Sequence, residues 1–205
     1  HPPTATQSVA LQKLAEFTLS TVKDEVFLLK GYAGTGKTTL IGTLVNSLWK
    51  VQKKAVLMAP TGRAAKVMSN YSSTQAFTIH RKIYYPKRER GGGVSFTLQR
   101  NKHRNTIFIV DEASMIPDTP SDAKLFENGS LLNDLIEFVD AGFKCRLLLI
   151  GDTAQLPPVK LDISPALDEK KLMLDYNREV THIELNEVVR QSIESDILLN
   201  ATQIR

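Results

Sequence analysis

The sequence predicts an α/β fold in which helices cover both faces of a parallel sheet. Short apolar runs of four to six residues alternate along the chain with longer segments of helical periodicity, as in α/β domains. Several runs end in polar or glycine-rich clusters, and in open α/β sheets a ligand lies beyond the carboxyl ends of the strands. With 205 residues, 42% of them hydrophobic, the chain can bury the core that such a sheet requires.

The first half of the chain is expected to alternate helix and strand. Its helical segments repeat apolar residues every three to four positions, whereas its strand segments are short and continuously apolar, as in buried parallel strands. The expected elements are a helix over 6–21, a strand over 26–29, a helix from 37 to about 50, a strand over 55–59, a helix from 63 to 68 or beyond, and a short helical or irregular piece at 78–80.

The second half is expected to begin with a projecting β-hairpin, because three glycines at 91–93 separate an aromatic segment from the alternating residues 94–98. An amphipathic pattern that stops at Gly142 predicts a helix over 130–141. The other expected elements are strands over 106–110 and 145–150, a short helix after Pro165, a last strand over 181–185, and a closing helix over 193–205.

A glycine-rich segment over residues 31–38, here called the phosphate loop, fits the pattern G-x-x-x-x-G-K-[ST] between a strand and a helix. Its glycines let backbone N–H groups approach a triphosphate, and the helix that starts at Lys37 points its positive end at the phosphates. The alternative is a glycine-rich turn that carries a lysine by chance. In that case the strand before it and the helix after it would also fit the pattern by chance. The residues expected to bind the nucleotide are Gly34, Thr35, Gly36, Lys37, Thr38 and Thr39.

Two acidic residues follow the strand over 106–110. Asp111 emerges at the edge of the sheet, where its carboxylate and the Thr38 hydroxyl can hold Mg²⁺ beside the phosphates. Glu112 points elsewhere and can orient or deprotonate the attacking water. The alternative reading is an acidic pair that caps a strand. Because the phosphate loop and the clusters at 60–63, 111–114 and 151–155 all follow expected parallel strands, we predict that they surround one site.

Two further residues are candidates for phosphate chemistry. Gln155 can hydrogen-bond the γ-phosphate or the attacking water, although an isolated glutamine in this position can equally be an ordinary loop residue. Arg190 can stabilise charge on the transferred phosphoryl group, and the alternative is a surface arginine.

The positive charge of the chain is concentrated in one segment. Residues 81–104 contain eight Lys and Arg residues against one acidic residue, whereas the whole chain has a net charge of +4. A basic patch of this kind is the electrostatic signature of nucleic-acid binding, and the alternative is a solvated loop that is basic by accident. A single cysteine, Cys145, suits a reducing compartment, and no apolar run is long enough to span a membrane.

A set of motifs resembles one known family. Gln7, GYAGTGKTT at 31–39, APTGRAAKVM at 59–68, TIH at 78–80, IVDEASM at 109–115, GDTAQLPPV at 151–159 and NEVVRQ at 186–191 occur in the order and spacing of superfamily 1 helicases. The chain is most similar to the RecD and Dda branch, which moves 5′ to 3′ on single-stranded DNA. The resemblance implies a RecA-like P-loop NTPase fold and a requirement for ATP and Mg²⁺.

The resemblance also implies roles for individual residues. Gln7 would contact the adenine, Gln155 would couple the γ-phosphate to DNA, and Arg190 would sense the phosphate. The segment 81–105 corresponds to the place of a small strand-separating wedge. The residues implied or expected to contact nucleic acid are Thr61, Arg63, Thr78, His80, Lys87, Arg88 and Arg90. Without the resemblance, Gln7 is equally a polar residue near a helix start and His80 a packed or capping histidine.

The family builds its motor from two RecA-like domains with ATP between them. We therefore expect residues 1–205 to be a single RecA-like domain, the first of the pair, whose partners are single-stranded DNA and a second RecA-like domain absent from this sequence. A monomer in the cytoplasm with no membrane partner is expected. The alternative function is a nucleotide-dependent module that binds nucleic acid without productive turnover, and a small-molecule kinase would need an acceptor pocket that the sequence does not reveal.

Overall fold

A computed structural model describes residues 2–88, 92–118, 130–152 and 164–187 of the chain. Its α-helices and strands alternate as expected for an α/β fold, with three short 3₁₀ segments labelled η. In chain order they are α1 (Ala5–Leu19), β1 (Glu25–Gly31), α2 (Lys37–Ser47), η1 (Leu48–Val51), β2 (Lys54–Ala59), α3 (Gly62–Ser72), β3 (Ala76–Thr78), α4 (Ile79–Ile83), β4 (Tyr84–Arg88), β5 (Val94–Leu98), β6 (Thr106–Val110), η2 (Ala113–Met115), α5 (Leu131–Asp140), β7 (Arg146–Gly151), η3 (Pro165–Leu167), α6 (Glu169–Leu174) and β8 (Glu179–Leu185).

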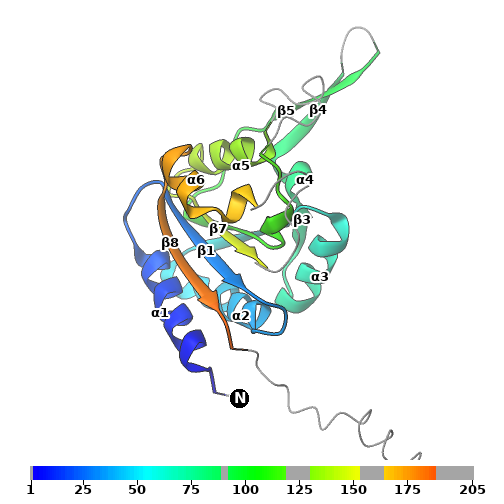
Figure 1. Cartoon of the computed structure of the whole chain (residues 1–205). Coiled ribbons are helices and arrows are strands. Elements are labelled where there is room, and N and C mark those ends of the chain that lie inside the picture. Colours follow the sequence, from blue (N-terminus) through cyan, green and yellow to red (C-terminus); the bar gives the residue numbers. More distant parts are fainter. Residues whose placement is uncertain (1, 89–91, 119–129, 153–163, 188–205) are drawn as a thin grey trace, which may run out of the picture.

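The centre of the described fold is a six-stranded sheet in the order β3-β2-β6-β7-β1-β8, and every pair in it is parallel. The strands lie side by side with all their carboxyl ends at one edge (Figure 1). The expected parallel sheet is therefore confirmed. The order places β2, β6, β7 and β1 next to one another, so the loops that follow these four strands are neighbours although they are far apart in sequence.

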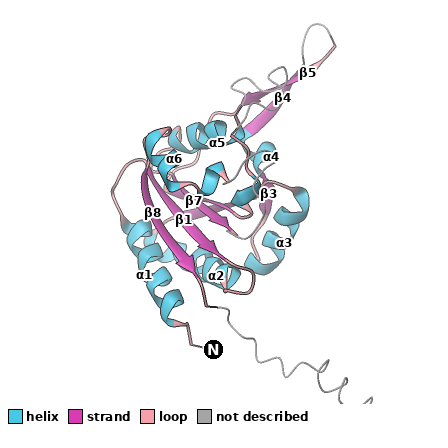
Figure 2. Ribbon diagram, in the orientation of Figure 1, coloured by secondary structure: helices cyan, strands magenta, loops and turns pink. Residues whose placement is uncertain are grey.

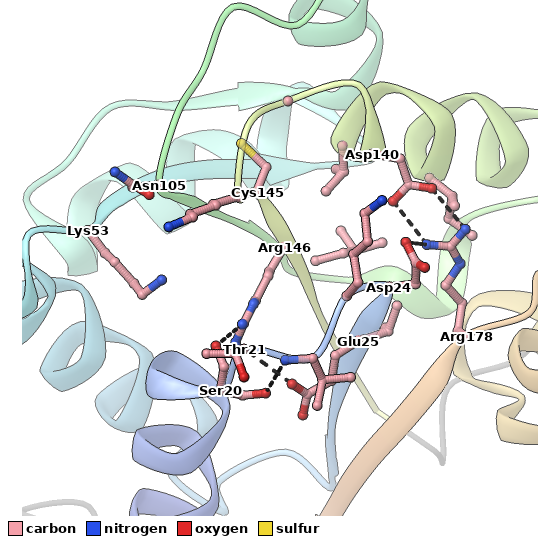
Figure 3. A pocket seen from close by; sticks show the side chains of 18 of the residues that line it. Ser20, Thr21, Asp24, Glu25, Lys53, Asn105, Asp140, Cys145, Arg146 and Arg178 are labelled. Atoms are coloured by element: carbon pink, nitrogen blue, oxygen red, sulfur yellow. Dashed lines mark hydrogen bonds and ion pairs between the residues drawn. The ribbon is translucent and has the colours of Figure 1, made fainter.

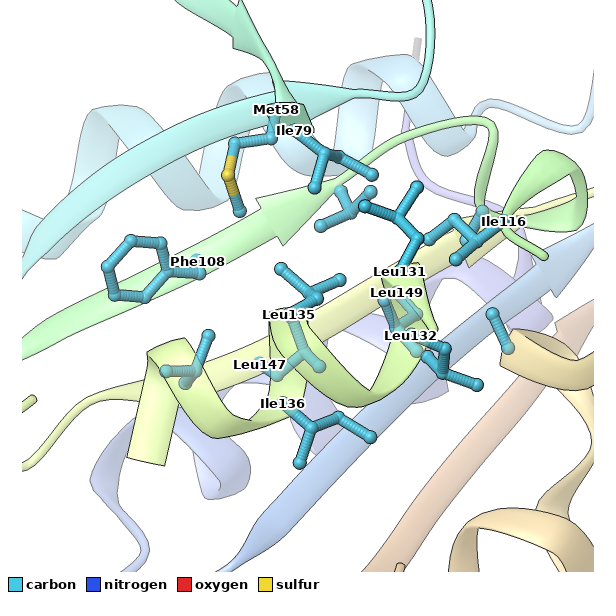
Figure 4. Close-up of a cluster of buried hydrophobic side chains, with 14 of the residues drawn as sticks. Met58, Ile79, Phe108, Ile116, Leu131, Leu132, Leu135, Ile136, Leu147 and Leu149 are labelled. Atoms are coloured by element: carbon cyan, nitrogen blue, oxygen red, sulfur yellow. The ribbon is translucent and has the colours of Figure 1, made fainter. Parts of the chain in front are cut away.

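Helices cover both faces of the sheet because successive strand residues point to opposite sides. On one face, alternate residues of the strands pack against α4, α5 and α6 in a single buried cluster that includes Phe108 and Leu149 (Figure 4). On the other face, the residues between them, such as Phe27 and Ile109, pack against α1, α2 and α3. Figure 2 shows the strands of the large sheet surrounded by helices. The central strand β6 is buried along its whole length, which explains its continuous apolar sequence.

The hairpin of β4 and β5 projects away from this body, as expected (Figure 1). Its base is anchored to the core, because the buried Tyr84 hydroxyl donates a 2.5 Å hydrogen bond to Oδ2 of Asp134 on α5. Gln99 closes the base from the other strand, where its backbone N–H donates to the Ile83 carbonyl and its side chain to the Tyr84 carbonyl. The hairpin therefore has a fixed root and an exposed outer part.

Most expected elements agree with the structure within a few residues, but two details differ. The three-residue strand β3 was not predicted, because it is short and only half buried and its sequence carries no alternation. The second helix is shorter than expected, since it tightens into the 3₁₀ segment η1 after Ser47. The expected helix over 193–205 lies outside the described residues. In the described part of the chain, no helix has the length and apolarity to cross a membrane.

Seven non-glycine residues of the described chain adopt positive φ, and six of them share one location. Each lies in the loop that enters one of the six strands of the large sheet: Ser73, Gln52, Asn105, Lys144, Asp24 and Asn177. Gln52 and Ser73 are the C-terminal caps of the helices that precede them, where a left-handed residue reverses the chain. The seventh, Glu112, lies at the opposite edge, directly after β6.

Candidate active site

The phosphate loop has the backbone conformation that its glycines allow. Gly34 and Gly36 adopt φ of 78° and 89°, in the left-handed region that glycine tolerates at little cost. Gly31 is required for a different reason, since a Cβ there would lie 2.9 Å from the carbonyl oxygen of Leu185 on β8. Thr35 is fully buried beneath the loop, and its hydroxyl donates a 2.8 Å hydrogen bond to the Tyr32 carbonyl. The loop is thus fastened to the neighbouring strand and to itself.

Lys37 begins α2 and folds back over the phosphate loop. Its ammonium donates hydrogen bonds of 2.6 Å to the Gly31 carbonyl and 2.8 Å to the Tyr32 carbonyl. Burial lowers the pKa of Lys37, whereas the nearby carboxylates of Asp152, Asp111 and Glu112 oppose that shift. At this position of the sheet edge, one half-buried ammonium therefore lies near three carboxylates.

Asp111 is held in one orientation from two sides. Its Oδ2 accepts a 2.9 Å hydrogen bond from the hydroxyl of Tyr71 on α3, and its Oδ1 accepts one of 2.9 Å from the Glu112 backbone N–H. Burial, followed by the charge of Asp111, raises the pKa of Tyr71, so that the phenol remains a donor. The Asp111 carboxylate is therefore preorganised at the end of β6.

Glu112 has an unusual backbone for a glutamate. Its φ of 56° and ψ of 34° put it in the left-handed region, immediately before η2. This conformation costs a residue with a Cβ about 1–2 kcal/mol. Strain of this kind clusters at functional sites, where it directs a side chain along a path that a regular strand end cannot give. The left-handed residue follows Asp111 directly and begins the turn into η2.

Gln7 lies against the phosphate loop. Its side chain completes a capping box at the start of α1, where Oε1 accepts from the Thr4 backbone N–H at 3.1 Å. The other end of the same amide donates a 3.0 Å hydrogen bond to the Thr35 carbonyl. Gln7 therefore joins the first helix to the phosphate loop. It is also a capping residue at the helix start, as the alternative interpretation expected.

The threonines expected at the nucleic-acid surface are N-caps at this same edge of the sheet. Thr61 follows β2 and accepts from the Ala64 N–H at 3.2 Å, and Thr78 ends β3 and accepts from the Arg81 N–H at 3.2 Å. Arg63 is exposed on the first turn of α3. His80 is half buried with its ring centroid 5.8 Å from that of Tyr84, and burial lowers its pKa. His80 thus lies in a packed environment, as expected if it is a packed histidine rather than a nucleic-acid contact.

Lys87 and Arg88 lie exposed on β4, opposite Ser95 and Val94 of β5. The hairpin carries these charges away from the sheet edge, so they do not belong to the cluster around Lys37 (Figure 1). Thr38 and Thr39 are exposed on the first turn of α2, beside the phosphate loop. Three further candidates, Arg90, Gln155 and Arg190, lie outside the described residues.

Two residues of the site were given no role in the sequence analysis, although one of them, Asp152, lies in the cluster over 151–155 that was expected at this edge. Tyr71 gave no signal, because an aromatic residue near the end of an amphipathic helix is usually a core residue. Asp152 did have a signal, since it follows β7 directly just as Asp111 follows β6, and the two strands are neighbours. The carboxylate of Asp152 is the largest charge influence on Lys37. Attention to the residue immediately after each strand would have found it.

The sheet order, the phosphate loop and the acidic strand end define a P-loop NTPase domain of the RecA-like α/β class. A family model described as an AAA domain matches residues 14–161, and the chain belongs to that family. Together with its relatives, the match identifies the chain as a first motor domain of the superfamily 1 helicase type.

Three curated relatives support this assignment. The chain is 30% identical over 175 residues to the ATP-dependent RecD2 DNA helicase of Deinococcus radiodurans, covering 83% of this chain and 20% of the relative. It is 30% identical over 171 residues to the RecBCD enzyme subunit RecD of Buchnera aphidicola, covering 73% and 25%. It is 28% identical over 177 residues to the ATP-dependent DNA helicase dda of Enterobacteria phage T4, covering 82% and 37%. The chain thus spans well under half the length of these relatives.

Solved structures share the fold at lower sequence identity. The Pif1 helicase of Candida albicans superposes with a TM-score of 0.55 at 23% identity, covering 99% of this chain and 44% of that one. A Bacteroides Pif1 helicase in complex with ADP-AlF3 and ssDNA gives a TM-score of 0.52 at 18% identity, covering 100% and 47%. These similarities establish the α/β architecture of the domain.

The left-handed backbone of Glu112 can be tested by comparing two variants that both lack the carboxylate. Glu112→Gly should unfold with a free energy about 1 kcal/mol higher than Glu112→Ala, because only glycine adopts this conformation without strain. Chemical denaturation of both proteins measures the difference. The same pair of substitutions at Lys66, an exposed position within α3, should give the opposite order. Equal stabilities at position 112 would contradict the assigned strain.

Proposed function

We propose that this chain binds ATP with Mg²⁺ and hydrolyses it as the motor domain of a DNA helicase. The observation that carries the proposal is the convergence at one sheet edge of a phosphate loop, its lysine and a preorganised carboxylate. The loop supplies backbone N–H groups and Lys37 supplies the positive charge that a triphosphate needs. The names of the relatives, which include ATP-dependent DNA helicases, support the same reaction.

The residues present fit a magnesium nucleotide. The Thr38 hydroxyl and the Asp111 carboxylate are oxygen donors of the type that Mg²⁺ prefers, and Mg²⁺ commonly takes its other ligands from phosphates and water. In the proposed reaction, Lys37 would exchange its two carbonyl partners for phosphate oxygens. Glu112 would orient the attacking water and accept its proton, while Tyr71 would keep the Asp111 carboxylate in position. Gln7 would lie near the base, beside the phosphate loop.

We also propose that single-stranded DNA crosses the same edge of the sheet and reaches the hairpin. Thr61 and Thr78 each begin a helix there, and helix N-termini offer N–H groups to phosphates without regard to base sequence. Arg63, His80, Lys87, Arg88 and Arg90 are the further contacts in this proposal. Movement in the 5′ to 3′ direction would require a second RecA-like domain that closes over the nucleotide, with Gln155 and Arg190 coupling hydrolysis to closure.

The nucleotide chemistry is tested by two substitutions with different expected effects. Lys37→Ala should abolish ATP binding, because it removes the charge that faces the phosphates. Glu112→Gln should bind ATP but hydrolyse it at least about a hundredfold more slowly, because the amide cannot act as a general base. Equilibrium binding of a fluorescent ATP analogue and phosphate release measure the two steps. Full turnover by Glu112→Gln would overturn the assigned role, and Glu16→Gln on the exposed surface of α1 is the matched control.

The second candidate function is a nucleotide-dependent module that binds nucleic acid without turnover. This alternative stays open because the chain covers only a small share of each relative. ATP turnover should therefore be measured with and without a single-stranded oligonucleotide, on this chain and on a form extended past Arg205. The motor proposal predicts stimulation by the oligonucleotide in the extended form. An extended form that binds the oligonucleotide and ATP but shows no turnover would favour the binding module.

The hairpin is tested through the salt dependence of oligonucleotide binding. Replacing Lys87, Arg88 and Arg90 by alanine should weaken binding and lower the slope of log K against log salt by about 0.7 for each phosphate that is no longer neutralised. Fluorescence anisotropy over a range of salt concentrations measures the slope. A control that replaces the exposed Lys50, Lys54 and Lys170 by alanine makes the same change in net charge. If the hairpin variant has the same slope as the control variant, the hairpin does not contact the oligonucleotide.

A further inference from the structure

The described structure contains a cavity at the edge of the sheet opposite the phosphate loop. It has a volume of about 340 Å³ and lies among the loops that enter the strands, including the α1–β1 loop and the residues just before β7 (Figure 3). Because β1 is seven residues long and a strand rises about 3.3 Å per residue, the cavity is about 20 Å from the phosphate loop. None of the residues assigned to the proposed ATPase site lines it.

Arg146 lines this cavity, and hydrogen bonds hold its side chain in one position. Its guanidinium donates to the backbone carbonyls of Phe17 and Ser20, and NH1 lies 3.7 Å from Oε2 of Glu25. Its side chain is only 10% exposed. A guanidinium held in this way is a preorganised donor, since its conformational entropy is already lost on folding.

Two lysines of the cavity add positive charge beside Arg146. Lys53 precedes β2 and extends toward Arg146, while Lys144 precedes β7 (Figure 3). No carboxylate of the described chain lies within 4.0 Å of either ammonium. Burial and then the charges of Arg146 and Lys144 lower the pKa of Lys53. The three cations thus repel one another across the cavity, and an anion between them would remove that repulsion.

Four further charged residues line the cavity, and the charges of Lys23, Asp24, Asp140 and Arg178 sum to zero. Arg178 contacts Asp140 at 2.8 Å and Asp24 at 3.5 Å on the far side (Figure 3). Glu25, the ion-pair partner of Arg146, is only 8% exposed, and its Oε1 accepts a 3.1 Å hydrogen bond from the Thr181 hydroxyl. Its Oε2 is buried without a hydrogen-bond partner among the described residues. A buried carboxylate oxygen in this state favours a ligand that brings a donor.

We propose that this cavity binds a small phosphate-bearing anion, either orthophosphate or a phosphomonoester. The charges decide the chemistry: Lys53, Lys144 and Arg146 against Glu25 leave two positive charges, which match the nearly double negative charge of a phosphate group at pH 7. A carboxylate would neutralise only one. A protonated phosphate oxygen, or a hydroxyl of the ester, would supply the donor that Glu25 Oε2 lacks.

Binding would add contacts among the segments that enter β1, β2 and β7, of which Arg146 already joins the first to the last. The ligand would touch the entrances of β2 and β7 through the two lysines and the α1–β1 loop through Arg146 and Glu25. A ligand that binds the folded state alone raises the free energy of unfolding by RT ln(1 + [L]/Kd), where [L] is the free ligand concentration. Phosphate should therefore raise the unfolding temperature of this protein independently of any nucleotide at the phosphate loop.

The test uses titration calorimetry with orthophosphate and with glycerol phosphate at constant ionic strength, together with thermal unfolding. Lys53→Gln/Lys144→Gln should lose about tenfold or more in affinity for both ligands, because each ammonium makes a charge-assisted hydrogen bond. The phosphate-induced rise in unfolding temperature should disappear with it. Lys50→Gln/Lys170→Gln, which changes the same charge at exposed positions outside the cavity, should bind phosphate like the wild type.

Phosphate at the phosphate loop is separated from phosphate in the cavity by the Lys37→Ala variant. That variant should keep the cavity binding, so this inference and the proposed ATPase function can fail independently. Two results would overturn the inference: no saturable phosphate binding in the Lys37→Ala protein, or equal affinity in Lys53→Gln/Lys144→Gln and its control. Acetate bound as tightly as orthophosphate would also overturn it, since the charge match would then be wrong.

Discussion

The parallel register of β2, β6, β7 and β1 is the constraint on which the rest of the structure depends. Backbone hydrogen bonds align Met58 with Val110, Val110 with Leu149 and Lys30 with Gly151, so four loops from distant parts of the chain start close to one another. The alternating burial of these strands keeps that register, because a slip of one residue would turn every apolar side chain to the wrong face. The chemistry at the sheet edge is thus positioned by the hydrophobic core.

Electrostatics at the two edges of the sheet differ in a consistent way. At the carboxyl edge, one half-buried lysine faces three carboxylates and bonds to backbone carbonyls, an arrangement that a polyphosphate with a divalent cation can enter by exchange. At the amino edge, Lys53, Lys144 and Arg146 line one cavity, and Arg146 also pairs with the buried carboxylate of Glu25. The first edge therefore suits an anion that brings a cation with it, as in the proposed function, whereas the second matches an anion alone. Both arrangements follow from which residues the sequence places directly before and after each strand.

Much of the fold could be predicted from the sequence, since short apolar runs that alternate with helical periodicity, together with a complete glycine pattern, leave few alternatives. The strand β3 could not, because three half-buried residues carry no periodicity of their own. In the site, Lys37 and Asp111 were found because a motif or a strand end marks them. Tyr71 was missed because its hydrogen bond to Asp111 joins residues 40 positions apart, and only the packing of α3 on the sheet brings them together. The cavity at the amino edge could not be predicted either, because the residues that line it are far apart in the sequence.

The central claim is that the loops at the carboxyl edge close around a magnesium-bound triphosphate. A crystal structure with Mg²⁺ and a non-hydrolysable ATP analogue tests it most directly. We predict that the Lys37 ammonium leaves the carbonyls of Gly31 and Tyr32 for the β- and γ-phosphates, and that Thr38 and Asp111 would hold the metal. A nucleotide bound elsewhere, or a Lys37 that keeps both carbonyl contacts while the nucleotide is bound, would contradict it.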